Sequence, residues 1–131
     1  MGSNPIEPVK FIKMQNIQEW VDEISNQNSL IIVEGKKDKQ ALNKLGINNT
    51  YSLDKSMHEL IDFIIDQDKE VIILTDLDGE GKKLYSKIKN ELQRNGIKVN
   101  DKYRKFLSRC NLTHIEGLYT YYKNNSREPL D

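Results

Sequence analysis

Residues 71–81 read VIILTDLDGEG, an apolar run that ends in two carboxylates separated by a single residue and then in two glycines. Four consecutive aliphatic residues are typical of a strand that is buried on both faces, as in a parallel sheet. The lysine-rich segment that follows predicts a helix. Asp76 and Asp78 therefore stand at the carboxyl end of a strand, which is where open α/β sheets bind their ligands.

A second apolar run, residues 30–33 (LIIV), is followed in the same way by EGKKD. If the two strands are neighbours in a parallel sheet, they end at the same edge and Glu34 lies close to Asp76 and Asp78. Three carboxylates at one point repel one another unless a proton or a cation lies between them. A hard divalent cation with oxygen ligands is the usual solution, so the sequence predicts a metal site at this edge.

The rest of the chain alternates between helical and strand patterns. One helix is predicted to start at an N-cap at Asn16, and a second after Asp38. A third follows a capping box at Ser56 and carries an apolar stripe, which consists of Met57, Leu60, Ile61, Ile64 and Ile65. Further helices are predicted over residues 82–95, 102–109 and 119–122. Short strands are predicted over residues 49–53, 97–99 and 113–118. This order predicts a single α/β domain with a mostly parallel central sheet and helices on both faces.

Composition sets the outer limits of the interpretation. The 131 residues contain 20 basic and 20 acidic side chains, so no global field marks a nucleic-acid binder, and the single cysteine, Cys110, excludes an internal disulfide. No apolar run is long enough to span a membrane and no signal peptide is evident, so we expect a cytoplasmic protein without membrane contact. We expect a lead-in and packed helix over residues 1–29, the main domain over residues 30–123 and a polar tail over residues 124–131.

The two acidic motifs together carry a family resemblance. An apolar strand followed by Glu34-Gly35-x-x-Asp38, and a later strand followed by Asp76-x-Asp78-Gly79-x-Gly81, closely resemble the Toprim domain from about Leu30 to about Leu118. This domain occurs in topoisomerases, primases, OLD-family nucleases and the nuclease that matures small ribosomal RNA. The chain looks most like the small, stand-alone Toprim proteins of archaea and bacteria.

The resemblance implies a role for each acid. Glu34 is similar to the family's general acid or base in phosphoryl transfer, and Asp76 and Asp78 are similar to its Mg²⁺ ligands, with Mn²⁺ as a second metal that this site can accept. A Mg²⁺ ion bound through one or two carboxylates keeps several waters and can orient a phosphate. We therefore expect action on nucleic acid, RNA or DNA, with phosphodiester cleavage preferred over strand transfer or nucleotide addition.

Residues beside the acids are candidates for phosphate contacts. Glycines let backbone amides approach a phosphate closely, and lysines neutralise it. The candidates are Gly35, Lys36, Gly79, Gly81 and Lys82, whereas Lys39, Lys87 and Lys89 are expected to be ordinary surface charges. Glu116 is a further candidate acid, since it follows a short apolar segment, whereas His114 is left without a role.

Two features leave alternatives open. In residues 102–109, Tyr103 and Phe106 are interleaved with basic residues, as in platforms that stack single-stranded bases, but an amphipathic helix with both rings in the core explains them equally well. The motif Asp76-Leu77-Asp78-Gly79 also resembles the nucleophile motif of haloacid dehalogenase-type phosphatases, which we rank lower because Glu80 follows the glycine.

A non-enzyme is the stronger alternative. The same fold can bind nucleic acid or dock on a ribonucleoprotein, using its acids only to hold a metal that positions phosphate. The presence of Glu34 together with both aspartates favours chemistry, because metal binding alone does not need the glutamate. A homodimer or a protein partner that completes the site is left open.

Overall fold

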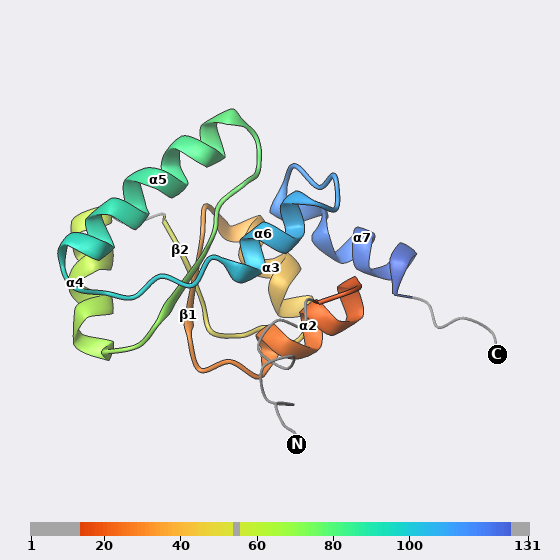
Figure 1. Ribbon diagram of the computed structural model, residues 1–131, viewed down its shortest axis with the longest axis horizontal. Coiled ribbons are helices and arrows are strands. Elements are labelled where there is room, and N and C mark those ends of the chain that lie inside the picture. Colours follow the sequence, from red (N-terminus) through yellow and green to blue (C-terminus); the bar gives the residue numbers. More distant parts are fainter. Residues whose placement is uncertain (1–13, 54–55, 127–131) are drawn as a thin grey trace, which may run out of the picture.

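A three-stranded parallel sheet forms the centre of the computed structural model, which describes residues 14–53 and 56–126 (Figure 1). Its strands are β1 (Leu30–Val33), β2 (Thr50–Ser52) and β3 (Val71–Leu74), in the order β2-β1-β3. Strand β1 lies in the middle, and its four residues pair in register with the four residues of β3, from Leu30 opposite Val71 to Val33 opposite Leu74. Both strands therefore end at the same level.

Helices cover the sheet on both faces, as the sequence predicts. They are α2 (Ile17–Ser25), α3 (Lys36–Lys44), α4 (Met57–Gln67), α5 (Gly79–Arg94), α6 (Lys102–Ser108) and α7 (Leu118–Asn125), with a short 3-10 helix, η1 (Ile115–Gly117), before the last. Alternate residues of β1 and β3 point to opposite faces. Ile31 and Ile72 pack with α2, α3, α6 and α7, whereas Ile32 and Ile73 pack with α4 and α5. The predicted α/β class, with one core on each side of the sheet, is confirmed.

Local signals in the sequence set several helix ends. Asn16 caps α2, and its Oδ1 accepts a hydrogen bond from the backbone N–H of Glu19 at 2.9 Å; Ser56 caps α4 in the same way, through Glu59 at 3.1 Å. The Glu19 carboxylate in turn accepts a hydrogen bond at 2.8 Å from the N–H of Gln15, the residue before the cap. Two backbone N–H groups at the start of α2, those of Gln15 and Glu19, therefore have side-chain acceptors.

Two predicted strands are wrong. The segment at residues 113–118 contains η1 and the start of α7, because its buried apolar residues, Ile115 and Leu118, are three apart, which is a helical and not an alternating spacing. Residues 97–99 form only an isolated bridge between Val99 and Val71 at the outer edge of β3. Ile65 is also exposed, at 42%, although the stripe on α4 predicted it to be buried.

The aromatic residues of α6 belong to the core. Tyr103 and Phe106 are both buried, which decides against the base-stacking alternative. The Trp20 indole N–H of α2 donates to the Tyr103 carbonyl at 2.9 Å, and the Tyr103 hydroxyl donates to Glu23 at 3.0 Å. Rings of Trp20 and Tyr103 meet edge to face with centroids 6.3 Å apart. These contacts fix α6 on α2, and through it the position of every side chain that α6 carries.

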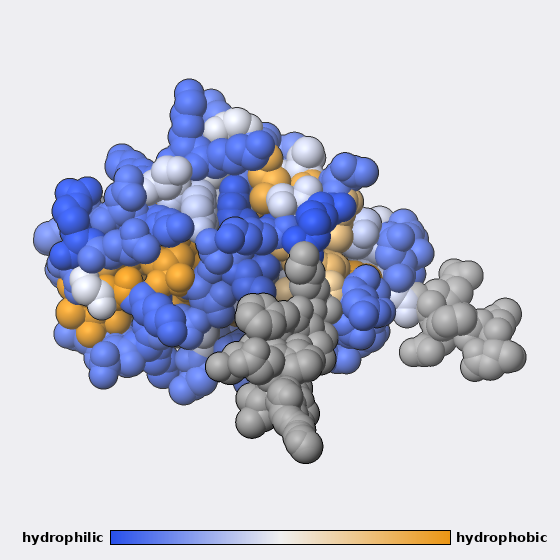
Figure 2. All heavy atoms as spheres, in the orientation of Figure 1, coloured by the Kyte–Doolittle hydropathy of each residue, from blue (hydrophilic) through white to orange (hydrophobic). Residues whose placement is uncertain are grey.

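Hydrophilic residues cover most of the face shown in Figure 2, with small hydrophobic areas, one of them at the left beside α4. Phe63 and Ile65 of α4 are the large hydrophobic residues exposed in the described ranges. Within those ranges, none of the helices has the length and the apolar character that a membrane crossing requires.

Replacement of Glu23 by Gln should lower the stability of the fold in a pH-dependent way. A hydrogen bond with Lys102 is the main cause that lowers the pKa of Glu23 below its usual value of 4.5. A carboxylate with a lowered pKa stabilises the folded state above that value and loses this contribution as the pH falls. We expect Glu23→Gln to cost about 0.2–1 kcal/mol at neutral pH, the range for an exposed ion pair, and the difference to vanish in acid.

Urea denaturation between neutral and acid pH measures this difference. Asp22→Asn is the matched control, since Asp22 is exposed on the same helix and an Asn can still accept the hydrogen bond from Gln18. A loss for Glu23→Gln that stays constant with pH would rule out the ionic explanation.

Candidate functional site

The ends of β1 and β3 bring the predicted acids together. Glu34 directly follows β1, and its Oε2 accepts a hydrogen bond at 2.9 Å from the backbone N–H of Asp76, which follows β3. The in-register pairing of the two strands causes this contact, because it places residues 34 and 75–76 side by side. We call Glu34, Asp76 and Asp78 the acidic edge.

Backbone amides orient both aspartates. Oδ1 of Asp76 accepts from the N–H of Ile115, and Oδ1 of Asp78 accepts from the N–H of Gly81, each at 2.8 Å. The second bond also caps α5, so Asp78 is fixed by the helix that it starts. One oxygen of each carboxylate is held in this way, and the other is left for a ligand.

His114 completes a group with metal-ligand spacing. Single ligand atoms of Asp76, Asp78 and His114 all lie within 4.8 Å of one another, and His114 Nε2 is 3.5 Å from Asp78 Oδ2. Two carboxylates and an imidazole fit a divalent cation. The carboxylates suit Mg²⁺ and Mn²⁺, whereas an imidazole ligand is more typical of Zn²⁺ or Fe²⁺, so the donor set agrees with a divalent metal but does not by itself select Mg²⁺.

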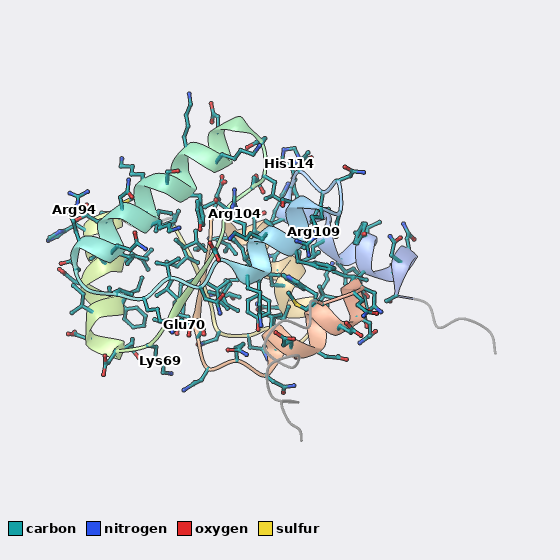
Figure 3. All side chains as sticks on the ribbon, viewed as in Figure 1. Lys69, Glu70, Arg94, Arg104, Arg109 and His114 are labelled. Atoms are coloured by element: carbon teal, nitrogen blue, oxygen red, sulfur yellow. The ribbon has the colours of Figure 1, made fainter. Side chains whose placement is uncertain are left out.

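The position of His114 depends on a contact between distant segments. The N–H of Leu77 donates to the carbonyl of Thr113 at 2.8 Å, and the Thr113 hydroxyl lies 2.9 Å from Nδ1 of His114. Sequence reasoning left His114 without a role because no local spacing relates it to Asp78. Figure 3 shows His114 on the side of the loop that joins β3 to α5.

The other predicted residues surround the acidic edge without joining it directly. Glu116 is exposed on η1, and it is not one of the three residues that share the metal-ligand spacing. Lys36 and Lys82 are exposed in the first turns of α3 and α5, and the N–H of Lys82 donates to the Asp78 carbonyl at 2.9 Å. Gly79 is the exposed first residue of α5.

Asp38 is a fourth carboxylate close to the site. It is buried on α3, where it accepts a hydrogen bond at 3.2 Å from the N–H of Gly35, so that this amide is already occupied. Burial raises the pKa of Asp38, and the negative charge of Asp76 raises it further, with smaller contributions from Glu34 and Glu116. The sequence marked Asp38 as a helix start and as a member of the first acidic motif, but gave no sign that it is buried next to the other acids.

A buried arginine lies behind the acids. Arg104 of α6 donates to the carbonyl and, at 3.0 Å, to the hydroxyl of Thr75, and at 2.9 Å to the carbonyl of Asp76. Its guanidinium also lies 4.6 Å from the centre of the Tyr85 ring. Burial lowers the pKa of Arg104, while Tyr85 and the carboxylates of the acidic edge oppose that shift. In the sequence, Arg104 is one of several basic residues in a predicted helix, and no local pattern relates it to the acids.

Gly81 allows the closest backbone approach in the site. A Cβ at this position would lie 1.9 Å from the carbonyl oxygen of Asp76, a distance that no side chain can occupy. The Thr75 hydroxyl donates to the Gly81 carbonyl at 2.8 Å, which ties the first turn of α5 to the end of β3. Gly81 therefore packs the loop that carries both aspartates, and its own N–H is used by Asp78.

Comparison with known proteins gives a consistent match. The family model for the Toprim domain matches residues 29–109, which include the acidic edge and Arg104 but end before His114 and Glu116. A UPF0292 protein of Methanocaldococcus jannaschii is 38% identical over 104 residues, covering 75% of this chain and 81% of that protein. A UPF0292 protein of Pyrococcus abyssi is 35% identical over 106 residues, covering 78% and 80%.

A solved structure is similar as well. It is described as a putative protein from Aquifex aeolicus and superimposes with a TM-score of 0.76 at 36% sequence identity, covering 79% of this chain and 98% of that one. Together with the family match, this likeness argues against the phosphatase alternative for residues 76–79.

Two neighbouring glycines should respond in opposite ways to a methyl group. We expect Gly81→Ala to destabilise the fold by about 1–3 kcal/mol or more, because the Cβ meets the Asp76 backbone. Gly79→Ala should stabilise it by about 0.5–1 kcal/mol, since nothing lies within 4 Å of a Cβ there and alanine favours a helix. Urea denaturation of both variants measures the two effects. Equal effects would show that the packing at Gly81 is relaxed.

Loss of the buried guanidinium should be costly. We expect Arg104→Met to destabilise the fold by roughly 3 kcal/mol, because the acceptors on Thr75 and Asp76 lose their donor. Arg109→Met is the control, since Arg109 is exposed at the end of the same helix and contacts only the Phe106 ring at 5.6 Å among the aromatic rings described. Thermal or urea denaturation compares them, and similar losses in the two variants would refute a special role for Arg104.

Proposed function

The chain belongs to the Toprim domain family, together with the UPF0292 proteins of archaea, and from this premise we propose that it is a metal-dependent enzyme that cleaves phosphodiester bonds in nucleic acid. The contact between Glu34 Oε2 and the N–H of Asp76 carries the proposal, because it gathers a proton-transfer group and the metal-binding loop at one point. Such proximity is what acid–base chemistry on a metal-bound phosphate requires.

Asp76 and Asp78 would hold the cation through the carboxylate oxygens that the backbone amides leave free. His114 is close enough to Asp78 to be a third ligand or to bind a metal-bound water. When bound, Mg²⁺ or Mn²⁺ supplies charge stabilisation to the phosphate oxygens that become more negative in the transition state. The fixed positions of both aspartates mean that little reorganisation is needed to accept the ion.

Glu34 is the residue to which we assign proton transfer. Its Oε2 is held by Asp76, which leaves Oε1 to exchange a proton with the attacking water or the leaving oxygen. Lys36 and Lys82, exposed at the starts of α3 and α5, are placed to neutralise phosphates on either side of the acidic edge. Arg104 positions the loop by donating hydrogen bonds to the backbone carbonyls of Thr75 and Asp76.

A binding module without catalysis is the second candidate, and one observation favours it. The hydrogen bond from Asp76 to Glu34 joins the ends of β1 and β3, so Glu34 has a structural role even if it never moves a proton. In that case the metal would only position phosphate, and the same surface would hold nucleic acid intact.

Two conservative substitutions distinguish the roles of the acids. We expect Asp78→Asn to weaken Mg²⁺ or Mn²⁺ binding by at least about tenfold with little loss of stability, since Asn caps a helix as well as Asp does. Glu34→Gln should leave metal binding largely intact, because its amide oxygen can still accept from the Asp76 N–H. Isothermal titration calorimetry with each metal measures the affinities.

Cleavage of labelled single-stranded and structured RNA and DNA, with Mg²⁺, Mn²⁺ or chelator, tests the activity itself. We expect metal-dependent products that disappear in Glu34→Gln. Nucleic acid that is bound but never cut by the wild type would contradict the enzyme and support the binding module. Products that persist in Glu34→Gln would remove the proton-transfer role from that residue.

A further inference from the structure

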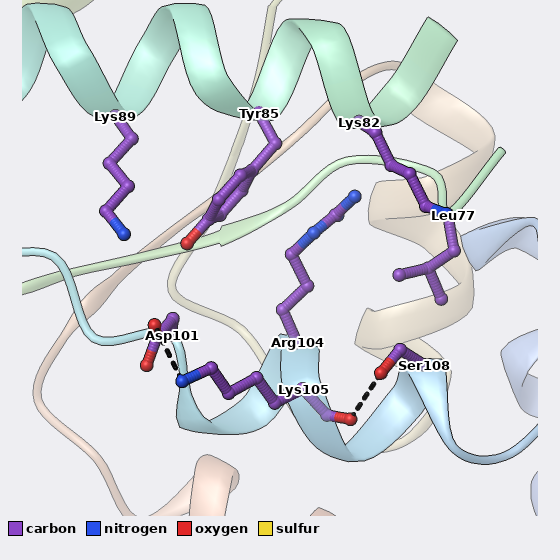
Figure 4. A pocket seen from close by; sticks show the side chains of 8 residues that line it. All are labelled: Leu77, Lys82, Tyr85, Lys89, Asp101, Arg104, Lys105 and Ser108. Carbon is purple, nitrogen blue, oxygen red and sulfur yellow. Dashed lines mark hydrogen bonds and ion pairs between the residues drawn. The ribbon is translucent and has the colours of Figure 1, made fainter. Parts of the chain in front are cut away.

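A groove lies between α5 and α6, next to the acidic edge (Figure 4). It has a volume of about 330 Å³. Helix α5 contributes Lys82, Tyr85 and Lys89, and helix α6 faces them with Arg104, Lys105 and Ser108. Lys82, Tyr85 and Lys89 are three and four residues apart, and Ser108 follows Lys105 by three residues and Arg104 by four, so each set lies on one side of its helix. We call this the α5–α6 groove.

Positive charge is concentrated in the α5–α6 groove. Lys82, Lys89, Arg104 and Lys105 line it, against one lining acid, Asp101, which pairs with Lys105 at 3.3 Å. The whole chain has equal numbers of basic and acidic residues, so this local excess is not a consequence of composition. A groove with an excess of cations selects an anionic ligand.

The groove begins where the acidic edge ends. The N–H of Lys82 donates to the carbonyl of Asp78 at 2.9 Å, and Arg104 at the groove wall donates to the carbonyl of Asp76. From Lys82 to Lys89 the helix rises by about 10 Å, at 1.5 Å per residue. A length of about 10 Å is enough to contact at least two successive phosphates of an extended strand, so more than one lysine can bind it.

We propose that the α5–α6 groove binds the phosphodiester backbone of a single-stranded nucleic acid and leads that strand to the acidic edge. This inference rests on the proposed function and names its substrate class: a single strand, bound through phosphates by Lys82, Lys89 and Lys105. A flexible single strand can enter a groove of this size. A duplex is stiff and wide, so it would contact only the lysines at the rim of the α5–α6 groove.

The same contacts make the binding independent of sequence. The Arg104 guanidinium lies over the Tyr85 ring at 4.6 Å, and Lys89 Nζ lies 5.6 Å from the same ring. These cations occupy the surface of the ring, so it is not offered to a base for stacking. Affinity then comes from phosphates, and it falls with salt in proportion to the number of phosphates bound.

Salt-dependent binding without metal tests the inference separately from catalysis. Fluorescence anisotropy in chelator follows a short labelled single strand, as DNA and as RNA, with the wild type and with the double variant Lys89→Gln and Lys105→Gln. We expect the variant to bind about tenfold more weakly, and the slope of log K against log salt to be smaller in magnitude by about 1.4, since each single-strand phosphate contact contributes about 0.7.

The double variant Lys87→Gln and Lys123→Gln is the matched control, because both lysines are exposed and neither lines the groove. It should bind as the wild type does, and circular dichroism of all variants checks that they fold. Equal weakening in control and groove variants would overturn the proposal, and so would tighter binding of a duplex of the same sequence. Equal competition by an oligo-glutamate peptide or by a free mononucleotide would overturn it as well.

Failure of the groove and failure of the proposed enzyme give different results. Binding that the groove variant loses, without any cleavage by the wild type, supports the groove and contradicts the enzyme. Metal-dependent cleavage by the wild type that the groove variant retains at the same KM supports the enzyme and contradicts the groove.

Discussion

A concentration of negative charge at one edge of the sheet is the constraint on which the structure depends. Glu34, Asp76 and Asp78 meet there, and Asp38 lies buried close by with a raised pKa. The fold must hold these groups together before any cation arrives. Three features of the fold hold them. Backbone amides donate hydrogen bonds to Asp76 and Asp78, Asp78 caps the start of α5, and the buried guanidinium of Arg104 binds the loop from behind.

The core on one side of the sheet determines where that guanidinium lies. Trp20 and Tyr103 join α2 to α6 through a hydrogen bond and an edge-to-face contact, and this places Arg104, the residue after Tyr103, at the end of β3. Helix α2 precedes the first strand of the sheet, yet it supports the site through α6. Packing far from the acids therefore has an electrostatic consequence at the acids.

Helix α5 connects the acidic edge with the α5–α6 groove. Its first turn, which includes Lys82, is fixed by Asp78, Gly81 and Thr75, and Lys89 follows about two turns later on the same side of the helix. In the proposed function, the metal-binding loop directly precedes this helix and the phosphate-binding groove runs along it. A bound strand would then follow the helix to the metal.

The layers of the fold and the acids at the sheet edge could be predicted from local patterns in the chain. Two apolar runs that end in carboxylates predicted adjacent parallel strands, and the motif spacing identified the Toprim family, because strand burial and helix periodicity are local properties. Caps at Asn16 and Ser56 followed from local hydrogen bonding. Residues 113–118 were assigned wrongly, since the burial of Ile115 and Leu118 was not visible in the sequence.

Which distant residues join the acids depends on how the helices pack in the folded chain. His114 reaches Asp78 because Thr113 binds Leu77, and Arg104 reaches Asp76 because Tyr103 packs on Trp20. Neither contact can be recognised from residue spacing in the sequence, because contacts between elements far apart in the chain depend on how their surfaces pack and not on a local repeat.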